Sequence, residues 1–137
     1  MASAKRVHWV RVLLAVLAAE ILPIVVLVLV VVIYSFVRSA DSPTPEEFAP
    51  RAGNWVGPFV GALSVLVFSF LVAKSVSNRP FVHGLCVGLG TAALDFCLGM
   101  SMGGGDGSVL AILTASNCGR IIAGVCGGWI GAGRRPV

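Results

Sequence analysis

Three ionisable residues, Glu20, Asp95 and Arg120, lie inside long apolar stretches of this 137-residue chain. A charged side chain near the centre of a bilayer costs at least about 2.5–3.5 kcal/mol, even on the most lenient insertion scale. Such residues are therefore expected to face the interior of a helix bundle and to find partners there. Because carboxylates and guanidinium groups in that setting form proton or ion pathways or tie helices together, these three are the first candidates for function.

The composition explains why these residues meet apolar surroundings. Hydrophobic residues make up 57% of the sequence and charged residues 12%, and the mean hydropathy is +0.95. A soluble domain is about 45–50% apolar and about 25% charged. The apolar residues form four blocks, each near the roughly 20 residues that cross a bilayer as a helix. The sequence predicts a single-domain (1–137), all-α integral membrane four-helix bundle with spans at about 12–37, 55–74, 81–102 and 109–129.

The first block is rich in valine, and residues 25–33 (VVLVLVVVI) would form a strand by propensity alone. Helix is predicted instead, because a chain in lipid must satisfy its own backbone hydrogen bonds and four long blocks cannot close a barrel. A cleaved signal peptide is not expected. The apolar run exceeds the roughly 7–15 residues of such a peptide, and Arg38 precedes the candidate small residue Ala40.

The distribution of lysine and arginine predicts the orientation. One side of the predicted topology carries seven basic residues: Lys5, Arg6, Arg11, Lys74, Arg79, Arg134 and Arg135. The other side carries only Arg38 and Arg51. The positive-inside rule then places both termini in the cytoplasm of a cell whose inner (plasma) membrane holds the protein as a multi-pass chain. Nucleic acid is not an expected partner, because the basic residues are scattered at helix ends.

The first connection, RSADSPTPEEFAPRAGN, contains a signal for the start of a helix. Thr44 suits the N-cap, Pro45 suits the first helical position, and Glu47 can complete a capping box. One interpretation is a single helical turn lying on the membrane with Phe48 inserted. An ordinary proline-rich connector is the alternative.

Depth predicts a partner for Glu20. At about 1.5 Å per residue, Glu20 lies about 12 Å from the cytoplasmic start of the first span and Arg120 about 13 Å from the cytoplasmic end of the fourth. An antiparallel contact between these two helices would let the side chains pair. Pro23 adds a predicted helix kink, because it removes a backbone donor and frees the carbonyl of Ala19 beside the acid.

Asp95 has a different set of expected partners. It lies about 10 Å below the outer end of the third span, near the levels of Thr114 and Asn117. Hydrogen bonds to Thr114, Ser116 or Asn117 would satisfy it, and protonation is the alternative. His83 is expected to be an ordinary interfacial histidine near the inner boundary.

Small residues at spacings of four predict close helix packing. The third span carries Gly84, Gly88 and Ala92. The fourth carries two overlapping series: Ala123, Gly127 and Gly131, and Gly124, Gly128 and Ala132. Two series on one helix indicate close neighbours on two sides. Internal packing explains one series, and a second copy of the chain or another membrane protein is an alternative partner for the other.

No pattern of an enzyme or a metal site stands out. The four cysteines lack CxxC spacing, and no GxSxG, HExxH, P-loop or dinucleotide-binding fingerprint occurs. No nucleophile and base lie at matching depth. The chain is therefore expected to have no catalytic residues, metal or cofactor, and to have the lipid bilayer as its main partner.

Two resemblances extend these predictions. The segments GALSVLVFSFLVAKSVSNRPFVHGLCVGLG (61–90) and GRIIAGVCGGWIGA (119–132) resemble uncharacterised small four-span prokaryotic membrane proteins with glycine-rich helices, which implies the four-span fold and no particular activity. LAAEI (17–21) is similar to the glutamate motif in the first span of small multidrug resistance transporters. That resemblance implies Glu20 as a proton and cation site. The chain departs from that family by lacking its Trp-Ser-Gly segment and by placing Asp95 and Arg120 in the membrane.

The residues support two functional hypotheses. The first is a structural or accessory membrane component that packs through its glycine faces, with Glu20, Asp95 and Arg120 as interior ties. The second is a small proton-coupled transporter or channel that uses Glu20, as a monomer or a dimer. A hydrated path to Glu20 would favour transport, and a dry, tightly packed pair would favour the structural role.

Overall fold

The computed structural model describes residues 8–39, 41–76, 79–101 and 107–133. These residues form four helices: α1 (Trp9–Val37), α2 (Pro45–Ser75), α3 (Pro80–Ser101) and α4 (Gly107–Gly133). Within these ranges there is no strand. All four helices are long and apolar enough to cross a membrane, and the predicted all-α four-helix membrane bundle is confirmed at that level.

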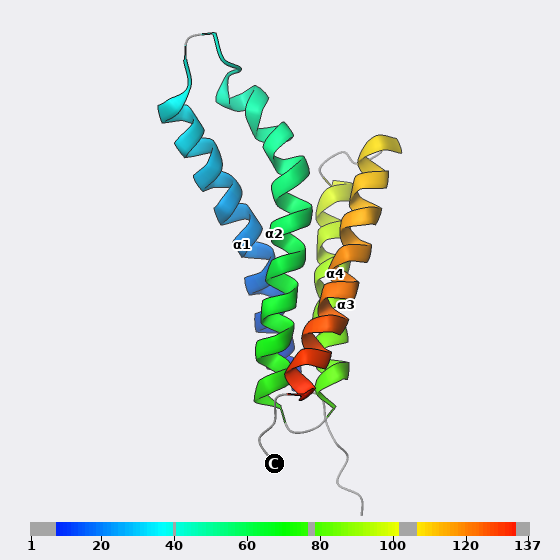
Figure 1. Cartoon of the computed structure of the whole chain (residues 1–137). Helices are drawn as coiled ribbons and strands as arrows, with labels where there is room; N and C mark the ends of the chain where they lie inside the picture. The colour runs from blue at the N-terminus through cyan, green and yellow to red at the C-terminus, as the bar shows by residue number, and fades with distance from the viewer. Residues whose placement is uncertain (1–7, 40, 77–78, 102–106, 134–137) are drawn as a thin grey trace, which may run out of the picture.

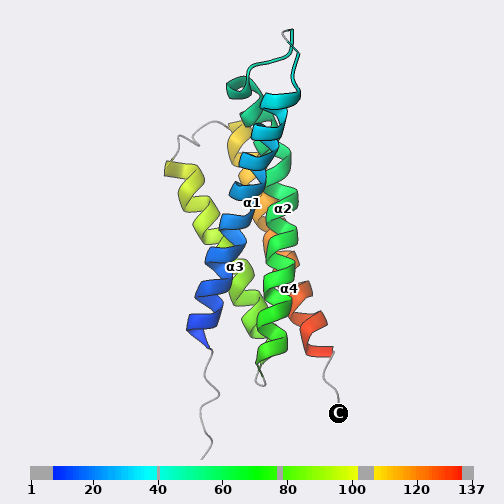
Figure 2. The ribbon, with the colours of Figure 1, turned by 90° about the vertical axis from the view of Figure 1, so that its left-hand side faces the viewer.

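The helices are arranged around a ring in the order α1, α2, α4, α3. Neighbours in this ring pack together, and the most extensive contact is that between α2 and α4. Across the ring, α2 also contacts α3, whereas the described parts of α1 and α4 have no Cα atoms within 8 Å of each other. Helices α1 and α3 run in one direction and α2 and α4 in the other (Figures 1 and 2). The line from α1 to α4 is therefore the long diagonal of the bundle.

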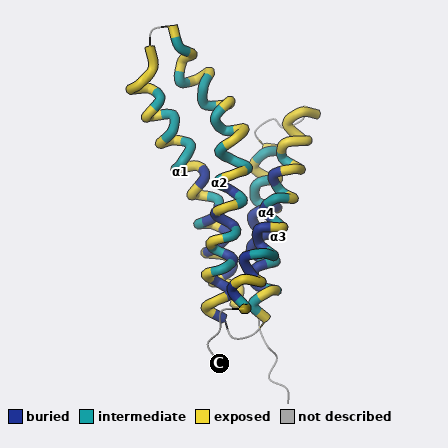
Figure 3. Tube along the Cα trace, in the orientation of Figure 1, coloured by how far each residue is buried: buried dark blue, intermediate teal, exposed yellow. Residues whose placement is uncertain are grey.

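The two halves of the bundle differ in packing. We call the half that contains the start of α1 and the end of α4 the proximal half, and the opposite half the distal half. Toward the distal end, α1 and α2 diverge from α3 and α4 (Figure 1). Buried residues are concentrated in the proximal half, whereas most of the distal half of α1 is exposed (Figure 3). The bundle is closed at one end and splayed at the other.

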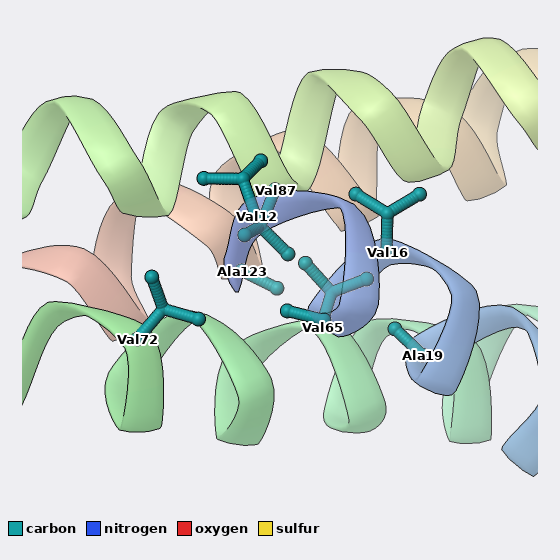
Figure 4. Close-up of a cluster of buried hydrophobic side chains, with 8 residues drawn as sticks. Val12, Val16, Ala19, Val65, Val72, Val87 and Ala123 are labelled. Atoms are coloured by element: carbon teal, nitrogen blue, oxygen red, sulfur yellow. The ribbon is translucent and has the colours of Figure 1, made fainter. Parts of the chain in front are cut away.

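The proximal core consists of small and β-branched side chains. Figure 4 shows the cluster, with Val65 and Val87 wholly buried near its centre. The other members are Val12, Ala15, Val16, Ala19, Val72 and Ala123. Small side chains let the helix axes approach closely, which is the usual mode of packing in membranes.

Both glycine series of α4 are used within the chain. A Cβ atom on Gly84 of α3 would lie 2.6 Å from the Gly124 carbonyl oxygen, and one on Gly128 would lie 3.1 Å from the Gly84 Cα. A Cβ on Gly131 would lie 2.7 Å from the Ala73 Cβ of α2. The Gly124 series thus packs on α3, where Gly88 also meets the Gly124 backbone, and the Gly127 series packs on α2. Internal packing accounts for both series, because α2 and α3 flank α4 on two sides, and a second copy or another membrane protein as partner stays a prediction.

The start of α2 differs from the predicted span. The helix begins at Pro45, ten residues before the predicted start at 55, and continues through Pro50 and Pro58. Its first turn has the predicted capping box, in which Thr44 accepts from the Glu47 N–H and the Glu47 carboxylate accepts from the Thr44 N–H. The turn is therefore the beginning of α2, and neither a separate surface turn nor an irregular connector.

An aromatic contact explains how this extension is held. The Phe48 ring stacks on the Tyr34 ring of α1, with centroids 3.8 Å apart and planes within 11°. The Tyr34 hydroxyl also donates to the Pro43 carbonyl oxygen at 2.9 Å. Phe48 thus packs on α1, and its insertion into the membrane stays a prediction.

The other span limits agree with the helices to within a few residues. The predicted end of the third span, Met102, lies outside the described residues. Four of the basic residues behind the predicted orientation also lie outside them: Lys5, Arg6, Arg134 and Arg135.

Candidate functional site

The three intramembrane ionisable residues meet at one point. Arg120 Nη1 donates to Glu20 Oε1, and Arg120 Nη2 lies 3.1 Å from Asp95 Oδ1. Arg120 is only 3% exposed, while the Glu20 and Asp95 side chains are 12% and 22% exposed. We call Glu20, Asp95 and Arg120 the ionic cluster. It joins α1, α3 and α4 near the middle of the bundle.

The contact between Glu20 and Arg120 crosses the long diagonal of the bundle. The prediction of a direct contact between the first and fourth helices is wrong, because the described parts of α1 and α4 do not approach each other. The two side chains meet in the interior, between the flanking helices α2 and α3. The matching depth of Glu20 and Arg120 thus predicts their pairing. The pair forms because both side chains are long enough to reach each other, although their helices are not adjacent.

Asp95 has a partner different from those expected from the sequence. It pairs with Arg120, and within the described part of the chain it forms no hydrogen bond with Thr114, Ser116 or Asn117. The Thr114 hydroxyl donates to the Leu110 carbonyl oxygen, and Thr114 is exposed. Asn117 Oδ1 is buried and lacks a hydrogen-bond partner within the described structure. Thr114 is therefore outside the site. Asn117 lies on α4 one helical turn before Arg120.

The charges of the cluster do not balance. Two carboxylates share one guanidinium, which cannot lose its proton under ordinary conditions. With both acids ionised the cluster carries one surplus negative charge in a largely buried position. A group of this kind favours uptake of one proton or attraction of one cation.

A partly open crevice leads from the distal end to the ionic cluster. It has two lobes of about 210 and 250 Å³. Both lobes are lined by Gly53, Gly57, Asp95 and Arg120. The first lobe extends to Val109 in the first turn of α4, and the second contains Glu20 and Pro23. We call these two lobes the distal crevice.

Pro23 lies one turn beyond Glu20 and lines the distal crevice. Helix α1 continues through it without interruption, and Pro23 is buried. The proline leaves the Ala19 carbonyl without its usual helical donor. The predicted kink stays a prediction. The helical turn that lacks this hydrogen bond lies beside Glu20.

Gly61 of α2 provides the space that Arg120 occupies. A Cβ on Gly61 would lie 2.9 Å from Arg120 Nη2 and 3.0 Å from Arg120 Nε. Sequence reasoning missed this residue. The signal that identifies it is the spacing of four among Gly53, Gly57 and Gly61, which places these glycines on one face of α2.

We expect Gly61→Ala to lower the free energy of unfolding by about 1 kcal/mol, because the added methyl group displaces the guanidinium from its carboxylates. Gly57→Ala is the matched control, since a Cβ there meets nothing within 4 Å. The loss should vanish when Glu20→Gln, Asp95→Asn and Arg120→Leu are already present, as unfolding measurements in mixed micelles can test. An equal loss in that background would show that Gly61 does not act through Arg120.

The proximal side of the site is closed. His83 is 1% exposed and uses both ring nitrogens, since Nε2 accepts from the His8 N–H at 3.1 Å and Nδ1 lies 2.9 Å from the Arg79 carbonyl oxygen. The imidazole therefore connects the start of α1 to the start of α3. The ring is buried because His8 and the first turn of α3 cover it, and the location of His83 at the inner membrane boundary stays a prediction.

The remaining chemistry-bearing residues form no second site in the described parts of the chain. No group of three or more His, Cys, Asp or Glu residues there could hold a metal ion. Cys86, Cys97, Cys118 and Cys126 are free thiols. No protein-family model, curated protein or solved structure matches the chain.

Proposed function

We propose that this small multi-pass membrane protein exchanges a proton or a small cation at the ionic cluster, as a proton-coupled transporter or channel. The observation that carries the proposal is the sharing of one guanidinium by Glu20 and Asp95 at the inner end of the distal crevice. An ion pair of one carboxylate and one guanidinium is neutral and does not attract a further charge. A cluster with two carboxylates and one guanidinium has a net negative charge and attracts a proton or a cation.

The asymmetry of access supports the same role. The distal crevice extends from Arg120 to Val109, about 16 Å along α4. On the other side of the cluster, small residues and His83 close the proximal half. A site near mid-membrane that is reachable from one end and closed at the other is the arrangement that alternating access requires.

The proposed orientation gives this asymmetry a direction. The excess of lysine and arginine at the proximal end argues for a cytoplasmic location of both termini and for residence in a prokaryotic inner membrane. In that orientation the distal crevice faces away from the cytoplasm. The ionic cluster would then take up its proton or cation from the outside.

Infrared difference spectroscopy in lipid nanodiscs tests the proposal. As pH falls, we expect the wild type to gain about one protonated carboxyl per chain relative to the double variant Glu20→Gln, Asp95→Asn. Either single variant should lose this gain, because removing one carboxylate leaves a balanced pair with Arg120. Thr114→Val is the control, since Thr114 lies in a span but outside the cluster. A wild-type spectrum that matches the double variant at every pH would contradict proton exchange.

The structural role remains the second candidate, because Arg120 is almost fully buried and contacts acids from two other helices. In this role the ionic cluster fixes which helices pack together. It predicts no proton uptake at the cluster and a loss of folded protein when the cluster is unbalanced. The infrared experiment therefore separates the two candidates.

A further inference from the structure

A groove between α1 and α2 in the proximal half lies outside the site described above. Its volume is about 360 Å³. Its walls are mostly apolar and include Leu14 and Leu71, which are 62% and 50% exposed. The other lining residues are Arg11, Ala15, Ala18, Phe68, Val72 and Ser75. We call this the proximal groove.

Arg11 gives the groove a charged end. Its Nη1 donates to the carbonyl oxygen of Ser75, the last residue of α2, at 2.8 Å. A guanidinium has five N–H donors, so this bond uses one of them. Arg11 is exposed and forms no ion pair with any described residue. Lys74, the neighbour of Ser75, is also exposed.

The acidic residues that the structure describes lie away from this end. They are Glu20, Asp41, Glu46, Glu47 and Asp95. The basic residues Arg11, Lys74 and Arg79 lie at the proximal ends of α1, α2 and α3. The proximal end is thus positively charged, and the helix ends there carry no acidic residue. The apolar groove begins at Arg11.

We propose that the proximal groove binds one anionic phospholipid, with an acyl chain between α1 and α2 and the phosphate at the guanidinium of Arg11. The apolar walls suit the acyl chain, and Arg11 suits the phosphate as a planar donor of several hydrogen bonds. A zwitterionic lipid carries a second, positive group that Arg11 and Lys74 repel. The preference for an anionic headgroup is therefore electrostatic. This site is independent of proton exchange at the ionic cluster.

Lipid competition measures the preference. The protein is placed in nanodiscs with equal amounts of phosphatidylglycerol and phosphatidylcholine of the same acyl chains, and the retained lipid is counted by native mass spectrometry. We expect the wild type to retain one phosphatidylglycerol per chain, and Arg11→Gln to lower that preference about fivefold. Arg11→Lys should keep most of it. Arg79→Asn removes the same charge from the same end outside the groove, and should have little effect.

A second variant tests the acyl-chain part of the site without changing charge. Ala18→Phe fills the groove and should reduce retained phosphatidylglycerol, whereas Leu17→Phe, an exposed neighbour outside the lining, should not. Equal losses for Arg11→Gln and Arg79→Asn would mean that only general positive charge attracts the lipid. Such a result, or equal effects of Ala18→Phe and Leu17→Phe, would overturn the proposal.

Discussion

Arg120→Leu is expected to cause the largest loss of folded protein of any single substitution at the site. It leaves Glu20 and Asp95 without their shared cation in a largely buried position. Breaking a buried ion pair by removing one partner typically costs about 3–5 kcal/mol. We expect a loss of that size in the free energy of unfolding, measured by denaturation in mixed micelles, with a matching drop in monodisperse yield after extraction.

The control for Arg120→Leu is the triple variant Glu20→Gln, Asp95→Asn, Arg120→Leu. It should recover much of the lost stability, because no charge remains without a partner. A double variant that keeps Asp95 should recover less, since that carboxylate would still be buried alone. If the triple variant is as unstable as Arg120→Leu, the stabilising effect of Arg120 comes from packing and not from its charge.

Gly127→Ala is expected to cause the second large effect. A Cβ at this position would overlap the Leu66 carbonyl oxygen and lie 2.9 Å from the Ser69 Cβ. The helix backbones must then separate, and overpacking of this kind costs about 1–3 kcal/mol. Because α2 and α4 form the most extensive contact of the bundle, the unfolding midpoint in mixed micelles should fall clearly.

Gly119→Ala is the matched control on the same helix, because a Cβ there meets nothing within 4 Å. Alanine is the better helix former, so this change should be neutral or slightly stabilising. Opposite signs for Gly127→Ala and Gly119→Ala would assign the loss to the contact between α2 and α4. A similar destabilisation by both would mean that the backbone of α4, and not its packing, determines the effect.

The fold could be predicted from the sequence because lipid leaves the chain few alternatives. Apolar blocks near 20 residues must be helical, so even the valine-rich part of α1 forms a helix. The start of α2 was predicted too late because its first ten residues include Glu46, Glu47 and Arg51, which suggest a loop when hydropathy is the only guide. The capping box at Thr44 was the better signal, since it specifies where backbone N–H groups begin to need partners.

The sequence predicts how deep the site residues lie in the membrane, but not which face of each helix they occupy. Residue counting gives the depth of Glu20 and Arg120, and depth is what brings them together. It does not give the face of the helix, and for Asp95 the result depends on the end from which the residues are counted. Counted from the proximal ends of their helices, Asp95 and Arg120 lie about 22 and 20 Å along α3 and α4, which is the same level. A count from the distal ends matches Asp95 with Thr114 instead, because α4 is longer than α3.

The sequence separation of Glu20 and Arg120 has a consequence for how the protein is made. The two residues are 100 positions apart, on the first and the last helix. At about 5–20 residues per second, a ribosome needs about 5–20 seconds to reach Arg120 after Glu20 has been synthesised. During that interval the acid on α1 has no guanidinium to neutralise it. We therefore expect α1 to enter the membrane with the charge of Glu20 unpaired or neutralised by a proton, until the final helix brings its partner.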